Sequence, residues 1–401
     1  MRILCASAQL PGHLDWGGYL QTAAELRRRG HDLLWVTGRA IAPFLQQANI
    51  PTHFLEETGW RWPPPPPLQP SPDIDPEELR RLRARRALDQ WFEEERVTSA
   101  TTALIKLGQE FRPDLIVSEV FLSAAGLAAE ALDLPFAIAG WPAMRPKATG
   151  GNERIVSEAR ERLKNVCVEF GLVGRNWTEM GPPAQQSPSL HITYWSPSWY
   201  RNVDLLPQTV HVGGTAWTSS NGVTTAWPDD LPWVFITLGT SFGRDANFFV
   251  AAARATVEIG GLPILALAGQ FNAEQEAALR THLPAETIVA QRIDLAAVLP
   301  KVAAAIHHGG AGVTHALVTH GVPQIIVPHA ADQMHQAQGV MRGGAGYHIA
   351  AKNATIEALV NALAQTLPDL APVRQGAATL QGEFATLGGV TRAADLLEAL
   401  V

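Results

Sequence analysis

Short apolar segments alternate with helical segments along most of this 401-residue chain. The first apolar segment, residues 2–8, is followed by residues 18–31, which have helical spacing and end in arginines and Gly30, as a helix C-terminus does. Residues 32–38 resume the apolar pattern, and residues 113–119 begin a second such unit. This alternation predicts parallel, doubly wound α/β sheets.

The pattern restarts after residues 206–232, a stretch rich in Gly, Thr, Ser and Pro that has little periodicity. We expect further buried strands within residues 233–239, 262–269, 286–290, 303–308 and 323–329. A chain of this length also exceeds what a single core usually serves. The sequence therefore predicts two Rossmann-like domains, residues 1–210 and 233–385, with a linker at 211–232.

Composition and charge exclude several classes of protein. A formal net charge of −7 argues against a nucleic-acid partner, because no basic field is present to neutralise phosphates. The two cysteines, Cys5 and Cys167, are too few for a disulfide framework and are expected to be buried thiols. No apolar stretch reaches the roughly 18–20 residues of a membrane span, and the first residues lack the features of a signal peptide. We expect a cytoplasmic protein.

A proline-rich segment, residues 60–78, leads into a strongly charged helix. That helix could cover a substrate or touch a membrane, or it could be a solvated surface helix. The acids that follow its arginines weaken the membrane interpretation. Asp73 and Asp75 superficially match a metal-binding Asp-x-Asp pair, but we interpret them as part of a loop and a helix N-cap.

Residues 305–316, AIHHGGAGVTHA, place two histidines before a glycine-rich turn and an expected helix. No Gly-Lys-Ser/Thr follows, so the turn is not a Walker loop, and His315 stands where a dinucleotide fingerprint would have its third glycine. A metal pair is unfavourable, because adjacent histidines in a strand point to opposite faces. Backbone N–H groups and the helix N-terminus could bind a phosphate with help from a histidine. A purely structural turn is the open alternative.

Asp332 and Gln333 follow the end of the strand expected at 323–329. Side chains at the carboxyl end of a sheet strand lie where α/β folds bind ligands. Together this pair supplies acceptors and an amide, which suit sugar hydroxyls. Taken alone, such a pair is more often a helix cap or turn, and the nearby glycine-rich turn is what favours a binding role.

His13 lies in the loop after the first strand, and Glu119 ends another strand of the same expected sheet. An imidazole near its ordinary pKa of about 6.5 suits general base catalysis at neutral pH. A carboxylate would orient it and stabilise its charged form. The two residues are therefore a candidate base and partner, although a lone histidine there would be read as a cap or surface residue.

Four motifs together resemble the family 1 glycosyltransferases of the GT-B fold, in particular bacterial enzymes that glycosylate macrolides, enediynes and similar natural products. The motifs are IHHGGAGVTHALVTHGVPQIIVPHAADQ, ITLGTSFG, the N-terminal PGH and RPDLIVSEVF. The resemblance implies two Rossmann-like domains that face each other across a cleft, the first binding an acceptor and the second a nucleotide sugar. It also implies that the last helix, within residues 386–401, crosses back to the first domain.

The resemblance also assigns roles to individual residues. It implies that His13 is the general base and that Glu119 is its acidic partner, where relatives commonly have Asp. The implied donor-binding residues are Thr240, Ser241, Arg292, Ile293, His308, Gly310, Ala311, Gly312, Val313, Asp332 and Gln333. The implied acceptor-binding residues are Asp15, Trp16, Trp60 and Trp62. No metal and no cofactor is expected, since the nucleotide sugar is a co-substrate.

Three departures from the family pattern concern the donor. Val313 replaces the usual Thr or Ser, which removes a hydroxyl contact to phosphate unless Thr314 or Ser241 substitutes for it. Ala316 stands where users of UDP-sugars often have a ribose-binding Glu, and Arg292 replaces a base-stacking Trp. An arginine can still stack on a base, so the choice between UDP- and TDP-sugars stays open.

The function expected from these residues is inverting, metal-independent transfer of a sugar from a UDP- or TDP-sugar to a hydroxyl of an apolar small molecule. The Asp-Gln pair weakly favours a gluco-type sugar, as in UDP-glucose. The alternatives are a catalytically silent nucleotide-sugar-binding protein, a nucleotide-sugar epimerase, and a lipid-linked glycosyltransferase of the same fold.

Overall fold

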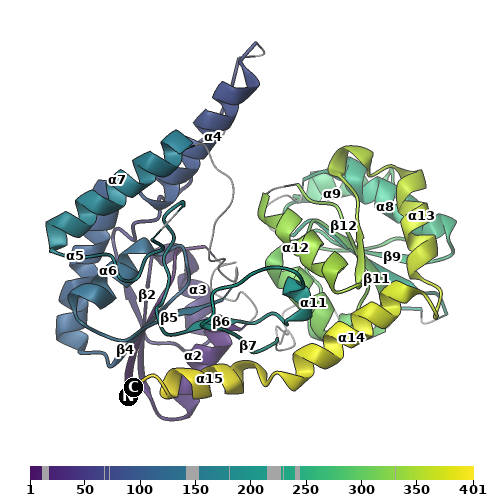
Figure 1. Ribbon diagram of the computed structural model, residues 1–401. Helices are drawn as coiled ribbons and strands as arrows, with labels where there is room; N and C mark the ends of the chain where they lie inside the picture. The colour runs from purple at the N-terminus through teal and green to yellow at the C-terminus, as the bar shows by residue number, and fades with distance from the viewer. Residues whose placement is uncertain are drawn as a thin grey trace. The chain divides into compact units, whose positions relative to one another are not determined.

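The computed structural model describes residues 1–10, 18–66, 68–71, 73–140, 153–179, 181–214, 227–228, 230–239, 244–329 and 331–401. The chain divides into two compact units (Figure 1). The first unit comprises Met1–Tyr194, Val203–Val212 and Gly388–Val401. The second comprises Trp195–Asn202 and Gly213–Leu387.

The first unit is built on a seven-stranded sheet with the order β3-β2-β1-β4-β5-β6-β7. Every pair of neighbouring strands is parallel. The strands are β1 (Arg2–Ala6), β2 (Asp32–Thr37), β3 (Thr52–Phe54), β4 (Leu115–Ser118), β5 (Phe136–Ala139), β6 (His191–Thr193) and β7 (Thr209–His211). The helices are α2 (Tyr19–Arg28), α3 (Ala42–Gln47), α4 (Pro76–Trp91), α5 (Glu94–Phe111), α6 (Ser123–Ala131), α7 (Glu153–Phe170) and α15 (Gly389–Glu398), with a short 3-10 turn, η1 (Arg39–Ile41).

Helices cover both faces of this sheet, as its continuously buried strands require. Ile3 and Cys5 of β1 face a core shared with α2, α3 and α15. Their neighbour Leu4 faces the opposite core, which α5 and α6 complete. Successive residues of a strand point to opposite faces, so a run of apolar residues fills both cores at once.

Helices α4 and α7 form a further layer, which packs through Leu88, Phe92 and Leu163. In Figure 1, the end of α4 where the helix begins extends beyond this layer. Asp75 caps that end, since its side chain accepts hydrogen bonds from the N–H groups of Glu77 and Glu78. This confirms that the second aspartate of the Asp-x-Asp sequence is a helix cap.

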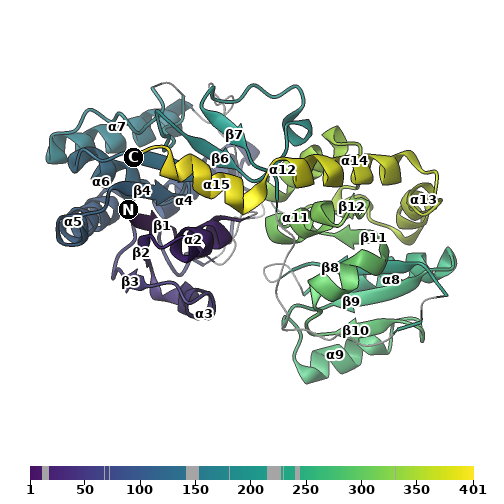
Figure 2. The same cartoon turned by 90° about the horizontal axis from the view of Figure 1, so that it is seen from below.

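The last helix, α15, belongs to the first unit and lies beside α2 (Figure 2). Ala393, Ala394 and Leu397 are buried in the core that α2 covers. On the outer side, Arg29 donates hydrogen bonds to Asp395 at 2.7 Å and to Glu398 at 2.8 Å. The chain therefore completes the core of its first unit with residues from its last helix.

The second unit is built on a six-stranded parallel sheet with the order β10-β9-β8-β11-β12-β13. Its strands are β8 (Trp233–Thr237), β9 (Leu262–Ala266), β10 (Ile288–Ala290), β11 (Val302–His307), β12 (Gln324–Ile326) and β13 (Gly346–His348). Its helices are α8 (Ala246–Glu258), α9 (Ala273–Arg280), α10 (Leu295–Val298), α11 (Ala311–Thr319), α12 (Ala331–Arg342), α13 (Ile356–Thr366) and α14 (Pro372–Thr386), with 3-10 turns η2 (Ser198–Tyr200), η3 (Leu299–Lys301) and η4 (Ala351–Asn353). Phe249 of α8 and Leu363 of α13 pack on one face of the sheet. Leu299 of η3 and Leu317 of α11 pack on the other face.

The predicted fold class, two doubly wound parallel sheets, is confirmed. Residues 195–202 pack with the second unit, although they fall inside the first predicted domain. The reason is an aromatic cluster: the Trp195 and Trp199 rings stack at 4.1 Å, and Trp195 also contacts His315 and Phe384 edge to face. Most of the predicted linker, at residues 215–226 and 229, lies outside the described residues.

Two smaller findings complete the fold. Cys5 and Cys167 are free and buried, as expected. Burial raises the pKa of the Cys5 thiol to about 12. In the part of the chain that the structure describes, no helix has the length and apolar character needed to cross a membrane.

Candidate active site

The strand order of the second sheet reverses between β8 and β11, where the chain changes direction across the sheet. Thr237, the last residue of β8, lies in register with His307, the last residue of β11, and His307 with Ile326 of β12. The loops after these three strands therefore emerge side by side. In open α/β sheets the crevice at such a reversal is where ligands bind.

His307 shapes the glycine-rich turn from inside the fold. Its Nε2 lies 2.9 Å from the Gln324 side-chain oxygen, and its Nδ1 accepts a hydrogen bond from the N–H of Gly309 at 3.1 Å. Burial, and to a smaller degree the neighbouring His308, lower the pKa of His307 to about 3. His307 is therefore a neutral structural residue that holds Gly309 at a φ of 89°, in the left-handed region that favours glycine.

His308 lies in the turn itself, between two glycines. A methyl group on Gly239 would approach its Cε1 to 2.6 Å, and one on Gly310 would approach its Nε2 to 2.4 Å. Burial, and to a smaller degree His329, lower the pKa of His308 to about 4, although a hydrogen bond with the Thr237 backbone acts in the opposite direction. At neutral pH this imidazole is uncharged and closely enclosed by backbone.

Helix α11 begins directly after the turn, with Gly310 as its N-cap. The first N–H groups of an α-helix have no acceptor within the helix, so they form a site that favours anions. Val313, in this first turn, packs against the apolar cluster that contains Leu317 and Ile293. The Thr314 hydroxyl donates to the Gly310 carbonyl at 2.8 Å. Thr314 is therefore not the substitute hydroxyl donor for Val313, because its proton is used within the helix.

Gln333 is brought to the same turn. Its side-chain oxygen accepts a hydrogen bond from the N–H of His329 at 2.7 Å, and a methyl group on Gly309 would lie 3.1 Å from the Gln333 carbonyl oxygen. Gln333 is buried. The glycine-rich turn and Gln333 thus meet at one point, and Gln333 also fixes the loop that precedes α12.

The structure describes only some of the remaining residues of the predicted donor set. Ile293 is half-buried and packs against the same cluster as Val313, whereas Arg292 is exposed. Ala311 and Gly312 occupy the first turn of α11. Thr240, Ser241 and the side chain of Asp332 lie outside the described residues.

His329 is a residue of this site that our sequence reasoning missed. It follows β12, its Nδ1 lies 2.8 Å from the Val327 carbonyl oxygen, and its Nε2 lies 4.0 Å from the carboxylate of Asp245. Its position at the end of an expected strand was a usable signal. Thr237 offered no such signal, because its hydroxyl matters only through tertiary contacts: it donates to the Ala266 carbonyl and accepts from the N–H of Gly239.

The first sheet reverses between β1 and β4, and Glu119 follows β4 at that point. Its Oε1 accepts a hydrogen bond from the N–H of Ala8 at 2.8 Å, and its Oε2 accepts one from the N–H of Phe121 at 2.7 Å. Burial raises the pKa of Glu119 to about 7, against the backbone N–H donors that lower it. Glu119 therefore ties the segment after β1 to the loop after β4.

His13, Asp15 and Trp16 lie outside the described residues. Of the other predicted acceptor residues, Trp60 is buried and contacts Phe121 edge to face at 5.4 Å, whereas Trp62 is 39% exposed. Trp60 thus lies next to the loop that Glu119 stabilises. Within the described residues, no group of three or more His, Cys, Asp or Glu side chains is placed to hold a metal ion.

Solved structures share this architecture along the whole chain. A calicheamicin glycosyltransferase matches with a TM-score of 0.79 at 23% identity, covering 100% of this chain and 98% of that one. A spinosyn rhamnosyltransferase in complex with thymidine diphosphate matches with a TM-score of 0.72 at 21% identity, covering 100% of both chains. At these identities the likeness shows the fold, which is GT-B.

Curated relatives are glycosyltransferases by name. The L-demethylnoviosyl transferase of Streptomyces niveus is 28% identical over 372 residues, which are 86% of this chain and 84% of the relative. The aklavinone 7-beta-L-rhodosaminyltransferase of Streptomyces galilaeus is 35% identical over 144 residues, 35% of this chain. That second match spans only 32% of the relative's own length.

The relatives define the class, and the solved structures define the fold: this chain is an enzyme, a nucleotide-sugar glycosyltransferase, with the GT-B fold. Within that class, residues 266–400 match the family described as erythromycin biosynthesis protein CIII-like, C-terminal domain. These residues are similar to that domain, and the relatives of the chain are natural-product glycosyltransferases, as the sequence motifs indicated.

Proposed function

We propose that this enzyme transfers a sugar from a UDP- or TDP-sugar to a hydroxyl of an apolar small molecule, with inversion and without a metal. The observation that carries the proposal is the meeting of His308, the N-terminus of α11 and Gln333 at one sheet edge. The thymidine diphosphate bound to the spinosyn enzyme supports a nucleoside diphosphate as the donor's leaving part.

The donor end of the reaction uses this edge. The diphosphate accepts hydrogen bonds from the first N–H groups of α11 and from the imidazole of His308. Because burial keeps the pKa of His308 low, its ring is neutral at physiological pH and has one N–H to donate. Asp332 and Gln333 hold the sugar hydroxyls, Thr240 and Ser241 form a second donor turn, and Arg292 and Ile293 border the base.

The acceptor end of the reaction uses the first unit. His13 removes the proton of the acceptor hydroxyl, and the oxygen attacks the anomeric carbon as its bond to the diphosphate breaks. The electron pair leaves with the nucleoside diphosphate, where His308 and the helix N-terminus stabilise the charge. Glu119 acts on His13 as its acidic partner and also holds the segment that leads to it. Asp15, Trp16, Trp60 and Trp62 border the apolar acceptor, and the reaction takes place in the cytoplasm.

A panel experiment tests the proposal directly. The protein is incubated with UDP- and TDP-sugars and a library of phenolic and sterol-like acceptors, and glycoside formation is followed by mass. Product that is lost in His13→Ala and reduced roughly 10²-fold in His308→Ala is the expected result. His282→Ala is the matched control, because it removes an exposed imidazole from the same unit. Equal rates in His13→Ala and wild type would show that His13 is not the base.

A catalytically silent nucleotide-sugar-binding protein is the second candidate. Val313 favours it, since the first turn of α11 lacks a hydroxyl at that position and Thr314 does not replace it. This candidate predicts measurable binding of UDP or TDP by calorimetry together with no product from any acceptor in the panel.

A further inference from the structure

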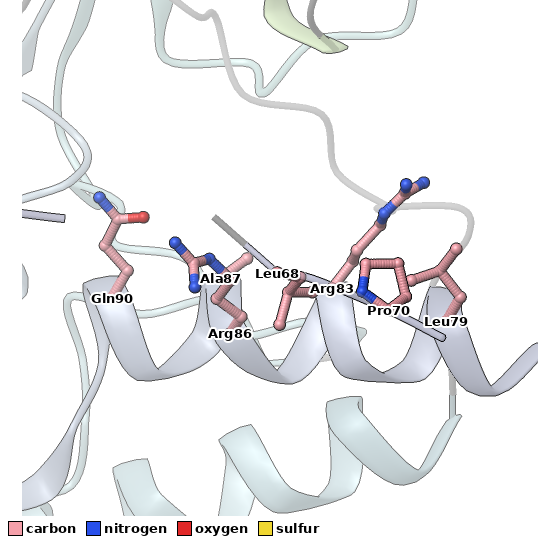
Figure 3. Close-up of a pocket in the computed structure, with 7 residues that line it drawn as sticks. All are labelled: Leu68, Pro70, Leu79, Arg83, Arg86, Ala87 and Gln90. Atoms are coloured by element: carbon pink, nitrogen blue, oxygen red, sulfur yellow. The ribbon is translucent and has the colours of Figure 1, made fainter. Parts of the chain in front are cut away.

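The first unit contains an open pocket between α4 and the proline-rich segment before it. Its volume is about 360 Å³, within the range of small-molecule sites. The segment contributes Leu68 and Pro70. Figure 3 shows Arg83, Arg86 and Gln90 rising from one side of α4, with Leu68 and Pro70 against that side. The remaining lining residues are Leu79 and Ala87.

Helical spacing explains why these side chains share one face. Residues 79, 83, 86 and 90 are separated by four, three and four positions, so they lie within a narrow stripe along α4. Apolar side chains and the guanidinium groups of two arginines therefore line the same pocket. Leu79, Ala87 and the two residues of the segment supply the apolar surface, and 37% of Leu68 is exposed to solvent.

The two arginines of the pocket differ in the contacts that they make with the rest of the protein. Arg86 donates a hydrogen bond to the Pro65 carbonyl and so holds the proline-rich segment over α4. Arg83 makes no ion pair with any residue that the structure describes, whereas Arg81 pairs with Glu78 and Arg85 with Glu158. The nearby acid Asp89 is engaged by Arg162. The pocket therefore presents a guanidinium whose charge no described carboxylate balances.

We propose that this pocket binds a small anionic amphiphile, an apolar ring system that carries a carboxylate or sulfonate. The apolar body would cover Leu68, Pro70 and Leu79, and the anionic group would pair with Arg83. A planar guanidinium suits such a group, because it donates two parallel hydrogen bonds to it. The site is distinct from the donor site at the strand ends of the second unit, and it does not depend on the proposed reaction.

Two fluorescent dyes of matched shape test the proposal on the intact protein. Anilinonaphthalene sulfonate is the anionic probe and phenylnaphthylamine is its neutral analogue, both titrated with saturating UDP present to occupy any nucleotide site. Ala87→Phe fills the pocket without changing its charge. We expect both dyes to bind the wild-type protein and to bind Ala87→Phe much more weakly, because the added ring occupies the pocket.

Charge variants then separate the anion from the apolar body. Arg83→Gln should weaken the anionic dye about fivefold and leave the neutral dye unchanged, as expected for one solvent-accessible ion pair. Arg83→Lys should retain part of the preference for the anionic dye. Arg81→Gln is the matched control, because Arg81 lies roughly 200° around the helix from Leu79. Circular dichroism and thermal melting confirm that each variant is folded.

Three results would overturn the proposal. Unchanged dye binding in Ala87→Phe would place the dye elsewhere. If Arg81→Gln and Arg83→Gln weakened binding of the anionic dye equally, the cause would be the general positive charge of the helix and not a site at Arg83. Equal weakening of the neutral and anionic dyes in Arg83→Gln would exclude an anionic ligand class.

Discussion

The carboxylate of Glu119 accepts a hydrogen bond from the backbone N–H of Ala8 at 2.8 Å, joining the ends of two adjacent strands of the first sheet. Its other oxygen accepts from the N–H of Phe121. Both oxygens therefore hold backbone that leads into loops of the candidate active site. This arrangement gives Glu119 a positioning role that is separate from any direct contact with His13.

Glu119→Gln should lower both stability and turnover. The amide NH₂ would face one of the two backbone N–H donors, and leaving a buried donor without an acceptor costs about 1–3 kcal/mol. Urea unfolding measures this loss, and kcat measured on the folded protein reports the effect on the site. Glu130→Gln is the matched control, because Glu130 also accepts from backbone N–H groups, those of Val173, Gly174 and Arg175. If both variants kept full turnover per folded molecule, Glu119 would be only structural.

Gly310→Ala should weaken the donor without unfolding the protein. The added methyl would lie 2.4 Å from Nε2 of His308, so the ring must move away from its place between the two glycines. Calorimetric titration with UDP or TDP should show a dissociation constant at least tenfold higher.

The control for that variant is Gly382→Ala. Gly382 lies within α14, is exposed, and has no atom within 4 Å of the methyl position. Replacing a helical glycine by alanine at such a place stabilises a protein by about 0.5–1 kcal/mol. Nucleotide binding should be unchanged in this variant, and a loss there as large as in Gly310→Ala would refute the role of His308.

Val313→Thr should tighten donor binding. A hydroxyl in the first turn of α11 can donate to a phosphate oxygen, and a charge-assisted hydrogen bond contributes roughly 1.5–3 kcal/mol. Loss of apolar contact with the surrounding cluster reduces that gain, so we expect about a tenfold lower dissociation constant.

Thr314→Val is the comparison, because it removes a hydroxyl that already donates to Gly310. It should lower stability and leave the affinity for nucleotide nearly unchanged. An unaltered dissociation constant in Val313→Thr would mean that another group already makes the phosphate contact.

Stability should fall as the pH is lowered from about 6.5 towards 4. Burial lowers the pKa of His191 to about 4, of His307 to about 3 and of His308 to about 4. In this range the unfolded chain binds more protons than the folded protein, because an unperturbed histidine has a pKa of about 6.5. Each of these groups therefore favours unfolding increasingly as acid is added.

Glu119 acts in the opposite direction, since its raised pKa of about 7 makes the folded state bind more protons between about pH 4.3 and 7. Three histidines outweigh one carboxyl, so the net effect should be a loss on the order of several kcal/mol between neutral pH and about pH 5. Urea unfolding at both pH values measures it. His307→Gln should flatten the dependence and His282→Ala should not; a profile that rises towards acid would contradict the histidine assignment.

Much of the fold could be predicted from the sequence because its determinants are local. A short stretch of sequence is enough to recognise an apolar run of strand length or a helical spacing. The same holds for Gly30, which follows the arginines of α2. The aromatic cluster of Trp195 and Trp199 could not be predicted, because its partners His315 and Phe384 lie far along the chain.

Some features of the candidate site could likewise be predicted from local sequence, and others could not. The spacing of the two adjacent histidines does not tell which of them points inward; the structure shows that it is His307. The helix after the glycine-rich turn does follow from the sequence pattern. The hydrogen bonds of Thr314 and Gln333 do not, since each side chain had several acceptors or donors open to it until the strands were placed. His329 was identifiable by position, but its approach to Asp245 depends on how β12 and α8 pack.

The place of α15 bears on how the protein is made. Ala393, Ala394 and Leu397 complete the core against which β1 and α2 pack, so that core joins residues from the two extremes of this sequence. On the ribosome, Ile3 and Tyr19 emerge early, yet the side chains that cover them are not translated until the whole second unit has been synthesised. The native core of the first unit can therefore be completed only after the second unit has been translated.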